Sequence, residues 1–189
     1  MVLMAIGTGL RRIELFALKW KDIDFAAKHL TATRSIVNQV VGICKTEASQ
    51  KPVPLHDSLA HALPEWRRQS SYGKREDWVF ASPHCHGKQP YWAQAIMRYH
   101  IGPAARRTRL QKRIGWHTFR HTYSTLLKSV GADIKVMQEL LRHSSVRCSL
   151  NTSTQAFMPA KRAAQSAALS LILAEEQSKV SQTCTVLHP

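Results

Sequence analysis

Basic and histidine side chains recur in four short segments that lie far apart along the 189-residue chain. In chain order they are Arg11 within TGLRRIEL, Lys45 before Thr46, His117 and Arg120 within HTFRH, and His143 within LRHSS. Two guanidiniums can bind the non-bridging oxygens of a phosphodiester through paired, charge-assisted hydrogen bonds. A lysine can protonate a departing oxygen, and histidines can donate to phosphate or move a proton near neutral pH. Such a set suits attack at phosphorus, where stabilising the growing charge is usually the largest catalytic contribution.

The order and spacing of these segments resemble the tyrosine recombinases of the phage-integrase family. That family combines a TGLRxxEL arginine box, a hairpin lysine, an HxxR box and an LGH box followed by a tyrosine, and the resemblance covers about residues 3–172. It implies Arg11 and Arg120 as catalytic arginines and His117 and His143 as catalytic histidines. It also implies Lys45 as the hairpin lysine, with Lys51 as the alternative. The implied activity is site-specific recombination or integration by cutting and rejoining DNA strands.

Two positions depart from the family pattern. Ser153 aligns with the nucleophilic tyrosine, and the chain has no tyrosine after Tyr123. An aliphatic hydroxyl is a far weaker acid than a phenol, and serine is also shorter, so we expect impaired catalysis. Arg142 stands where the family has glycine, a change that we expect the fold to tolerate. A catalytically inactive DNA-binding remnant or regulator is therefore the alternative to a recombinase.

Charge independently favours a polyanionic partner. The chain has 27 Lys and Arg against 12 Asp and Glu, a net charge of +15 and a pI near 10.2. Nucleic acid is the commonest such partner, and we expect double-stranded DNA rather than a small-molecule substrate. Taken singly, however, Arg11 or Arg120 would be interpreted as a surface charge, and His143 as a histidine at a helix end.

No cofactor or metal is expected. His117 and His121 have the i,i+4 spacing of zinc ligands, but no glutamate follows His117, and further ligands are missing there and around His84–His86. The four cysteines have no CxxC spacing, so free thiols are expected. The sequence contains no apolar run of about 18 residues and no signal-peptide pattern, which favours a cytoplasmic protein without a membrane span.

The pattern of hydrophobic residues and turn signals predicts an α+β fold, mostly helical, with a small three-stranded antiparallel sheet. Strands are expected between Leu30 and Leu55, and a loop or linker over Gly102–Gly115. One expected helix ends at Ile6. Further helices are expected over Arg12–Leu18, Asp57–Gln69, Tyr91–Ile101, Thr118–Val130, Ile134–Leu141 and Pro159–Glu176.

We expect one catalytic domain over residues 1–176, a flexible tail over 177–189 and no N-terminal core-binding domain. The family resemblance further implies a tetramer assembled on DNA.

Overall fold

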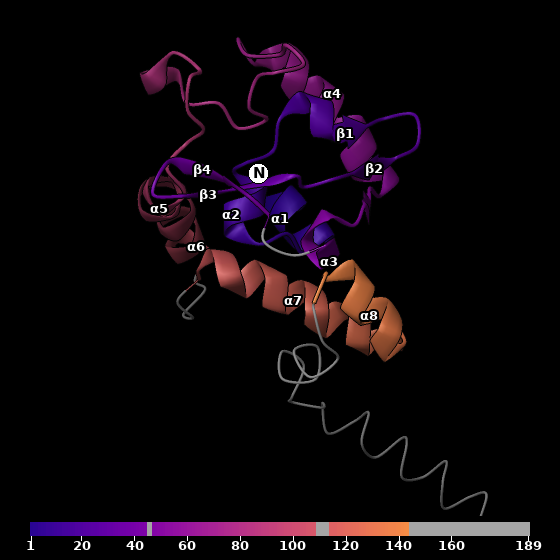
Figure 1. Ribbon diagram of the computed structural model, residues 1–189. Helices are drawn as coiled ribbons and strands as arrows, with labels where there is room; N and C mark the ends of the chain where they lie inside the picture. The colour runs from indigo at the N-terminus through magenta and orange to yellow at the C-terminus, as the bar shows by residue number, and fades with distance from the viewer. Residues whose placement is uncertain (45–46, 109–113, 144–189) are drawn as a thin grey trace, which may run out of the picture. The chain divides into compact units, whose positions relative to one another are not determined.

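The computed structural model describes residues 1–44, 47–108 and 114–143, which belong to one compact unit (Figure 1). Its longer helices are α1 (Val2–Thr8), α4 (Asp57–Gln69), α7 (Trp116–Ser129) and α8 (Ile134–Leu140). The shorter helical segments are α2 (Arg12–Leu15), η1 (Trp20–Asp22), α3 (Glu47–Gln50), η2 (Pro83–Cys85), α5 (Ala93–Ile96), η3 (Met97–Ile101) and α6 (Gly102–Arg107). The strands are β1 (Ile23–Asp24), β2 (His29–Leu30), β3 (Arg34–Val37), β4 (Val40–Ile43) and β5 (Val53–Pro54).

A three-stranded antiparallel sheet is present, in the order β1-β2-β5, but its first strand lies before the range in which strands were expected. The β3–β4 hairpin, however, forms a second, separate sheet rather than extending the first. Asn38 and Gln39 join its strands with φ values of 48° and 63°, as expected for a tight two-residue hairpin turn. The predicted fold class is confirmed, while the grouping of the strands was not foreseen.

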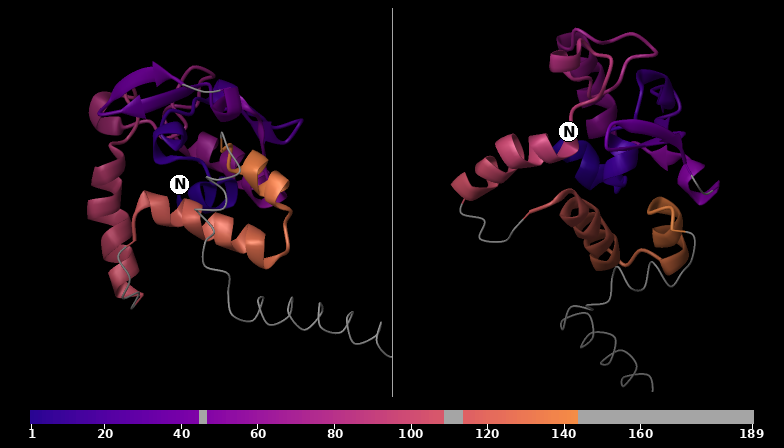
Figure 2. Two further views of the ribbon diagram at one scale, coloured as in Figure 1. Left: turned by 60° about the horizontal axis from the view of Figure 1, so that its bottom comes forward. Right: turned by 60° about the vertical axis from the view of Figure 1, so that its left-hand side comes forward.

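The core forms where α1 and α2 meet the first sheet and the start of α7. Of the apolar residues Ile13, Leu15, Phe16 and Leu18, whose pattern predicts a core face, the last three are buried and Ile13 is only half-buried. The Phe16 ring packs edge-on against Trp116, with ring centroids 4.9 Å apart. Helix α7 packs along α1 and also contacts α8 (Figures 1 and 2), so that the second half of the chain is held against its beginning.

The prediction of a linker over Gly102–Gly115 is wrong for its first half. Helix α5 continues through a π-helical segment, η3, directly into α6, and Pro103 lies in the first turn of α6. A proline ring inside a helix clashes with the carbonyl four residues earlier, and the wider π turn immediately before it accommodates the ring. Gly and Pro therefore mark a local widening of this helix and not its end.

Smaller differences concern helix ends. Helix α2 stops at Leu15, whereas Leu18 was predicted. The N-cap of α4 is His56, whose Nδ1 accepts a hydrogen bond from the Ser58 N–H, and not Asp57. Helix α8 begins at Ile134 as predicted, and the Asp133 side chain caps it by accepting from the Lys135 N–H at 2.6 Å. The expected Pro159–Glu176 helix and the tail lie outside the described residues, and none of the described helices is long and apolar enough to cross a membrane.

Candidate phosphate-binding site

Arg11 is positioned by the junction between α1 and α2. Gly9 ends α1 in the left-handed conformation, with φ 61°, and Arg11 then adopts an extended backbone as the N-cap of α2. The Arg11 N–H donates to Glu14 Oε2 at 2.8 Å, and Arg11 Nη1 donates to Glu14 Oε1 at 2.9 Å. Glu14 is only 2% exposed, whereas the Arg11 side chain is 36% exposed. A buried carboxylate therefore orients a guanidinium that solvent can still reach.

Arg120, on α7, connects three distant segments. It is 3% exposed, and its Nη1 and Nη2 donate to the carbonyls of Gly9 and Leu141. No carboxylate among the described residues forms an ion pair with it. Burial, followed by repulsion from Arg11, lowers the pKa of Arg120 to about 9, so this guanidinium is still protonated near neutral pH.

His143 lies in the turn that ends α8. The His143 N–H donates to the Gln138 carbonyl and the Arg142 N–H to the Glu139 carbonyl, both at 3.0 Å, which is a Schellman motif. Arg11 Nη2 donates to the Arg142 carbonyl at 3.2 Å, which brings this turn to the arginine box. Burial, followed by repulsion from Arg120 and Arg11, lowers the pKa of His143 to about 4, so its imidazole is neutral at pH 7.

His117 lies one helical turn before Arg120 on α7 and is exposed. Its ring meets that of His121 edge-on, with centroids 4.3 Å apart. Partial burial lowers the pKa of His117 most, and the positive charges of His121, Arg120 and Arg11 lower it further. Because His117 and Arg120 are three residues apart on α7, their side chains lie on neighbouring positions of one helix face.

The structure thus links Arg11, Arg120 and the His143 turn by direct hydrogen bonds and places His117 within electrostatic reach. Lys45 and Ser153 lie outside the described residues, while the alternative lysine, Lys51, is exposed after α3.

Arg142 also belongs to this hydrogen-bond network, although the sequence indicated only that the fold would tolerate it. Its fully buried guanidinium donates from Nη2 to Glu14 Oε2 at 2.6 Å and from Nη1 to the Ser49 carbonyl at 3.0 Å. The only signal in the sequence was an arginine where the family pattern has glycine.

Charge at this site is unbalanced. Three guanidiniums, those of Arg11, Arg120 and Arg142, are connected by hydrogen bonds around one carboxylate, that of Glu14. Positive charges held in a poorly solvated place favour binding of an anion. A guanidinium has five N–H donors, and Arg11 and Arg120 each use two in the contacts described, which leaves donors for an incoming oxyanion.

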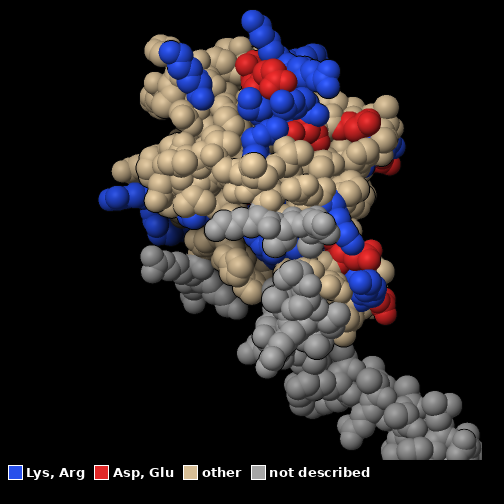
Figure 3. Space-filling model, viewed as in Figure 1, with Lys and Arg blue, Asp and Glu red and all other residues tan. Residues whose placement is uncertain are grey.

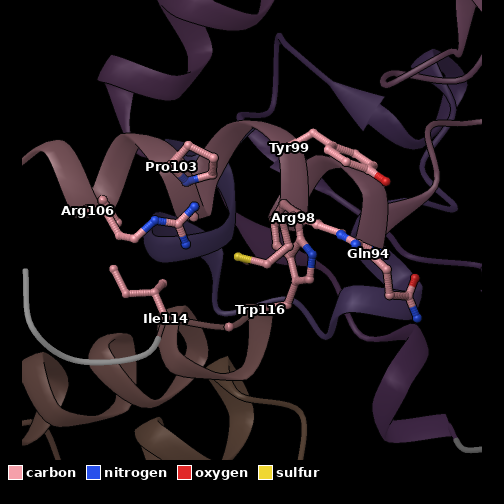
Figure 4. A pocket seen from close by; sticks show the side chains of 11 residues that line it. Gln94, Arg98, Tyr99, Pro103, Arg106, Ile114 and Trp116 are labelled. Carbon is pink, nitrogen blue, oxygen red and sulfur yellow. The ribbon is translucent and has the colours of Figure 1, made fainter.

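A separate cavity lies between the α5–α6 helix and the start of α7 (Figure 4). It measures about 860 Å³ and is lined by Arg98, Tyr99, Arg106, Ile114 and Trp116, among others, but by no residue of the arginine network. Trp116 is fixed there because its Nε1 donates to the Ala93 carbonyl at 2.8 Å. The cavity is therefore a basic and aromatic neighbour of the site rather than the site itself.

Acidic residues are absent from a long central stretch of sequence. Residues 78–132 contain nine Lys and Arg and no Asp or Glu. Figure 3 shows the contrast on one face: acidic side chains accompany basic ones near α4 and α8, whereas the basic side chains where α5 and α6 lie have no acidic neighbour among the coloured residues. This part of the surface is suited to a polyanion.

Comparison with known proteins gives a consistent result. The model of the phage integrase family matches residues 1–156. The chain is 30% identical over 174 residues to a XerC-like tyrosine recombinase of Caldanaerobacter subterraneus, covering 80% of this chain and 44% of that protein. It is 31% identical over 143 residues to the tyrosine recombinase XerD of Listeria monocytogenes, covering 74% and 44%. The chain thus spans less than half the length of these relatives.

Solved structures agree on the fold. The Tn1549 transposon integrase in complex with circular intermediate DNA superposes with a TM-score of 0.71 at 22% identity, over 87% of this chain and 57% of that one. The XerH site-specific recombinase bound to palindromic difH substrate superposes with a TM-score of 0.62 at 22% identity, over 86% and 43%.

Proposed function

The chain belongs to the phage integrase family, and from this premise we propose that it binds double-stranded DNA and holds one phosphodiester between Arg11 and Arg120. The observation that carries the proposal is the hydrogen-bonded network joining Arg11, Arg120 and the turn of His143, because it presents an excess of positive charge that no described carboxylate balances. The DNA-bound states of the Tn1549 integrase and XerH support a DNA substrate for this fold.

In this proposal Arg11 and Arg120 bind the non-bridging oxygens, whose charge grows as phosphorus is attacked. His143, neutral at pH 7, donates a hydrogen bond to a phosphate oxygen, and exposed His117 donates a second or moves a proton. Lys45, or alternatively Lys51, protonates the departing oxygen. Removing one charge-stabilising donor typically lowers the rate by about two to three orders of magnitude.

Strand cleavage and rejoining is the activity that the family implies, but Ser153 occupies the place of the nucleophile. Its alkoxide is much harder to form than a phenolate and is a worse leaving group when the DNA is resealed. Ser153 therefore favours the second candidate function, a DNA-binding remnant or regulator with impaired or absent catalysis.

DNA binding would extend beyond the single phosphate. Arg98, Arg106 and Arg107 are exposed on the α5–α6 helix, beside the aromatic cavity and within the acid-free stretch. We propose that these side chains contact the DNA on either side of the phosphodiester that Arg11 and Arg120 bind. We further propose a cytoplasmic protein that forms a homotetramer on DNA, as family membership implies.

The first test is titration of the purified chain against a labelled duplex at several salt concentrations. Binding should weaken steeply with salt, because each neutralised phosphate releases counterions. The proposal would be refuted if the chain does not bind the duplex at low salt, or if its affinity does not change with salt concentration.

A second test separates binding from chemistry. A suicide duplex that traps covalent intermediates should leave no adduct with the wild-type chain, whereas Ser153→Tyr should gain one if the rest of the site is competent. An adduct mapped to Ser153 would show that serine can act and would refute the impairment.

A further inference from the structure

Arg142 occupies its position at an energetic cost. Its φ of 52° is in the left-handed region, which is unfavourable for a residue with a Cβ by roughly 1–2 kcal/mol. Its guanidinium is fully buried, and its Nε has no hydrogen-bond partner within the described part of the chain. Glycine would satisfy the same Schellman turn without these penalties. Strain and a buried charge that coincide beside a functional site point to a role for the side chain.

The contacts of Arg142 define that role. Its side chain binds Glu14, and Glu14 in turn binds both the backbone N–H and the guanidinium of Arg11. The same side chain holds the carbonyl of Ser49 in α3, the helix that follows the segment of Lys45. Its own carbonyl accepts from Arg11 Nη2. One residue thus ties the arginine box, helix α3 and the histidine turn together.

We propose that Arg142 is a positioning residue of the phosphate-binding site: it fixes the Glu14 carboxylate, and through it the orientation of Arg11, and it anchors α3. The Arg142 guanidinium is paired with the Glu14 carboxylate, whereas Arg120 donates to backbone carbonyls and has no carboxylate partner among the described residues, so Arg142 acts through Arg11 and not as a phosphate ligand. The inference rests on the proposed function of Arg11 as such a ligand.

The substitution Arg142→Gly tests this directly. Glycine suits the left-handed backbone, so the turn and the carbonyl contact to Arg11 can persist while the side-chain contacts are lost. We expect duplex affinity at fixed salt to fall about tenfold, and the slope of log affinity against log salt to fall by about one, because Arg11 loses its orientation toward a phosphate. Arg142→Lys, which keeps the charge but lacks the fork that reaches both Glu14 and Ser49, should recover only part of the affinity.

Two further variants separate positioning from general destabilisation. If Arg142 acts through Arg11, the double variant Arg142→Gly with Arg11→Ala should bind no more weakly than Arg11→Ala alone. Arg67→Ala is the matched control, because Arg67 on α4 also donates to a backbone carbonyl, that of Gly73, yet has no contact with the site. It should lower the melting temperature without changing the salt slope.

The outcomes are distinguishable. If the wild-type chain does not bind the duplex, or if Arg11→Ala leaves binding unchanged, the proposed function itself fails. If Arg11→Ala weakens binding but Arg142→Gly changes neither affinity nor slope, only the positioning role fails. It also fails if the losses from Arg142→Gly and Arg11→Ala simply add.

Discussion

Glu14 should be the residue on which the stability of the arginine network most depends. It accepts three hydrogen bonds, from Arg11 N at 2.8 Å, Arg11 Nη1 at 2.9 Å and Arg142 Nη2 at 2.6 Å, and it is 2% exposed. Removing one partner of a buried ion pair typically costs about 3–5 kcal/mol. The amide in Glu14→Gln keeps the shape of the side chain and one acceptor. We therefore expect a loss at the lower end of this range, about 3 kcal/mol of unfolding free energy. For a domain of this size that lowers the melting temperature by about 6–12 °C.

The assay is urea and thermal unfolding at constant ionic strength, with Glu76→Gln as the control. Glu76 is 63% exposed and contacts Lys21 Nζ at 2.9 Å, so its loss should leave the unfolding midpoint unchanged within error. Added sulfate should raise the melting temperature of Glu14→Gln more than that of the wild type, because the variant holds more unbalanced positive charge. If Glu14→Gln unfolds like the control, or if sulfate has no differential effect, the electrostatic account of the site is wrong.

Three more perturbations follow from the geometry. The pKa of His143 is lowered from 6.5 to about 4 in the folded chain, so the unfolded state binds more protons between these values. Unfolding free energy should therefore fall as the pH drops from 6.5 to 4, by up to about 3 kcal/mol, and His143→Gln should flatten this dependence in urea titrations. Gly9→Ala and Gly131→Ala both place a side chain at positive φ, but only at Gly9 would the new methyl overlap a neighbouring ring, that of Tyr123. Gly9→Ala should therefore cost about 1–3 kcal/mol more in the same assay, and equal costs would contradict the close packing. Arg106→Ala should reduce the salt slope of duplex binding by about one, whereas Arg68→Ala, on α4 beside Glu65, should not change it.

Local signals in the sequence predicted the elements that local chemistry determines. Gly9 at the end of α1 and Asp133 at the start of α8 behave as their residue types indicate, because each acts on backbone within a few residues. The α6 helix was missed because Gly102-Pro103 usually ends a helix, and only the preceding π turn lets the chain continue. The separation of the β3–β4 hairpin from the other strands likewise depends on packing and not on the pattern within either strand.

The site was predictable only where the family pattern supplied the residues. The resemblance selected Arg11, Arg120 and His143, and hydrogen bonds bring these segments together. It could not reveal that Arg142 supports Glu14, because the two residues are 128 positions apart and form a pair through tertiary packing alone. The carbonyls that orient Arg120 were equally hidden, since a main-chain acceptor carries no signature in the sequence.

The contacts that orient Arg11 and Arg120 indicate how the proposed DNA binding would persist if Ser153 replaces the nucleophile. Arg120 is oriented by two backbone carbonyls, and Arg11 by a buried carboxylate and a third carbonyl, all from residues that precede His143. None of these contacts involves Ser153. A change of nucleophile can therefore abolish strand cleavage and leave the positive charge of the site in place, because its orientation is built into the packed core. For this reason the Ser153→Tyr substitution should alter adduct formation far more than duplex affinity, and a large change in affinity would show that the two are coupled.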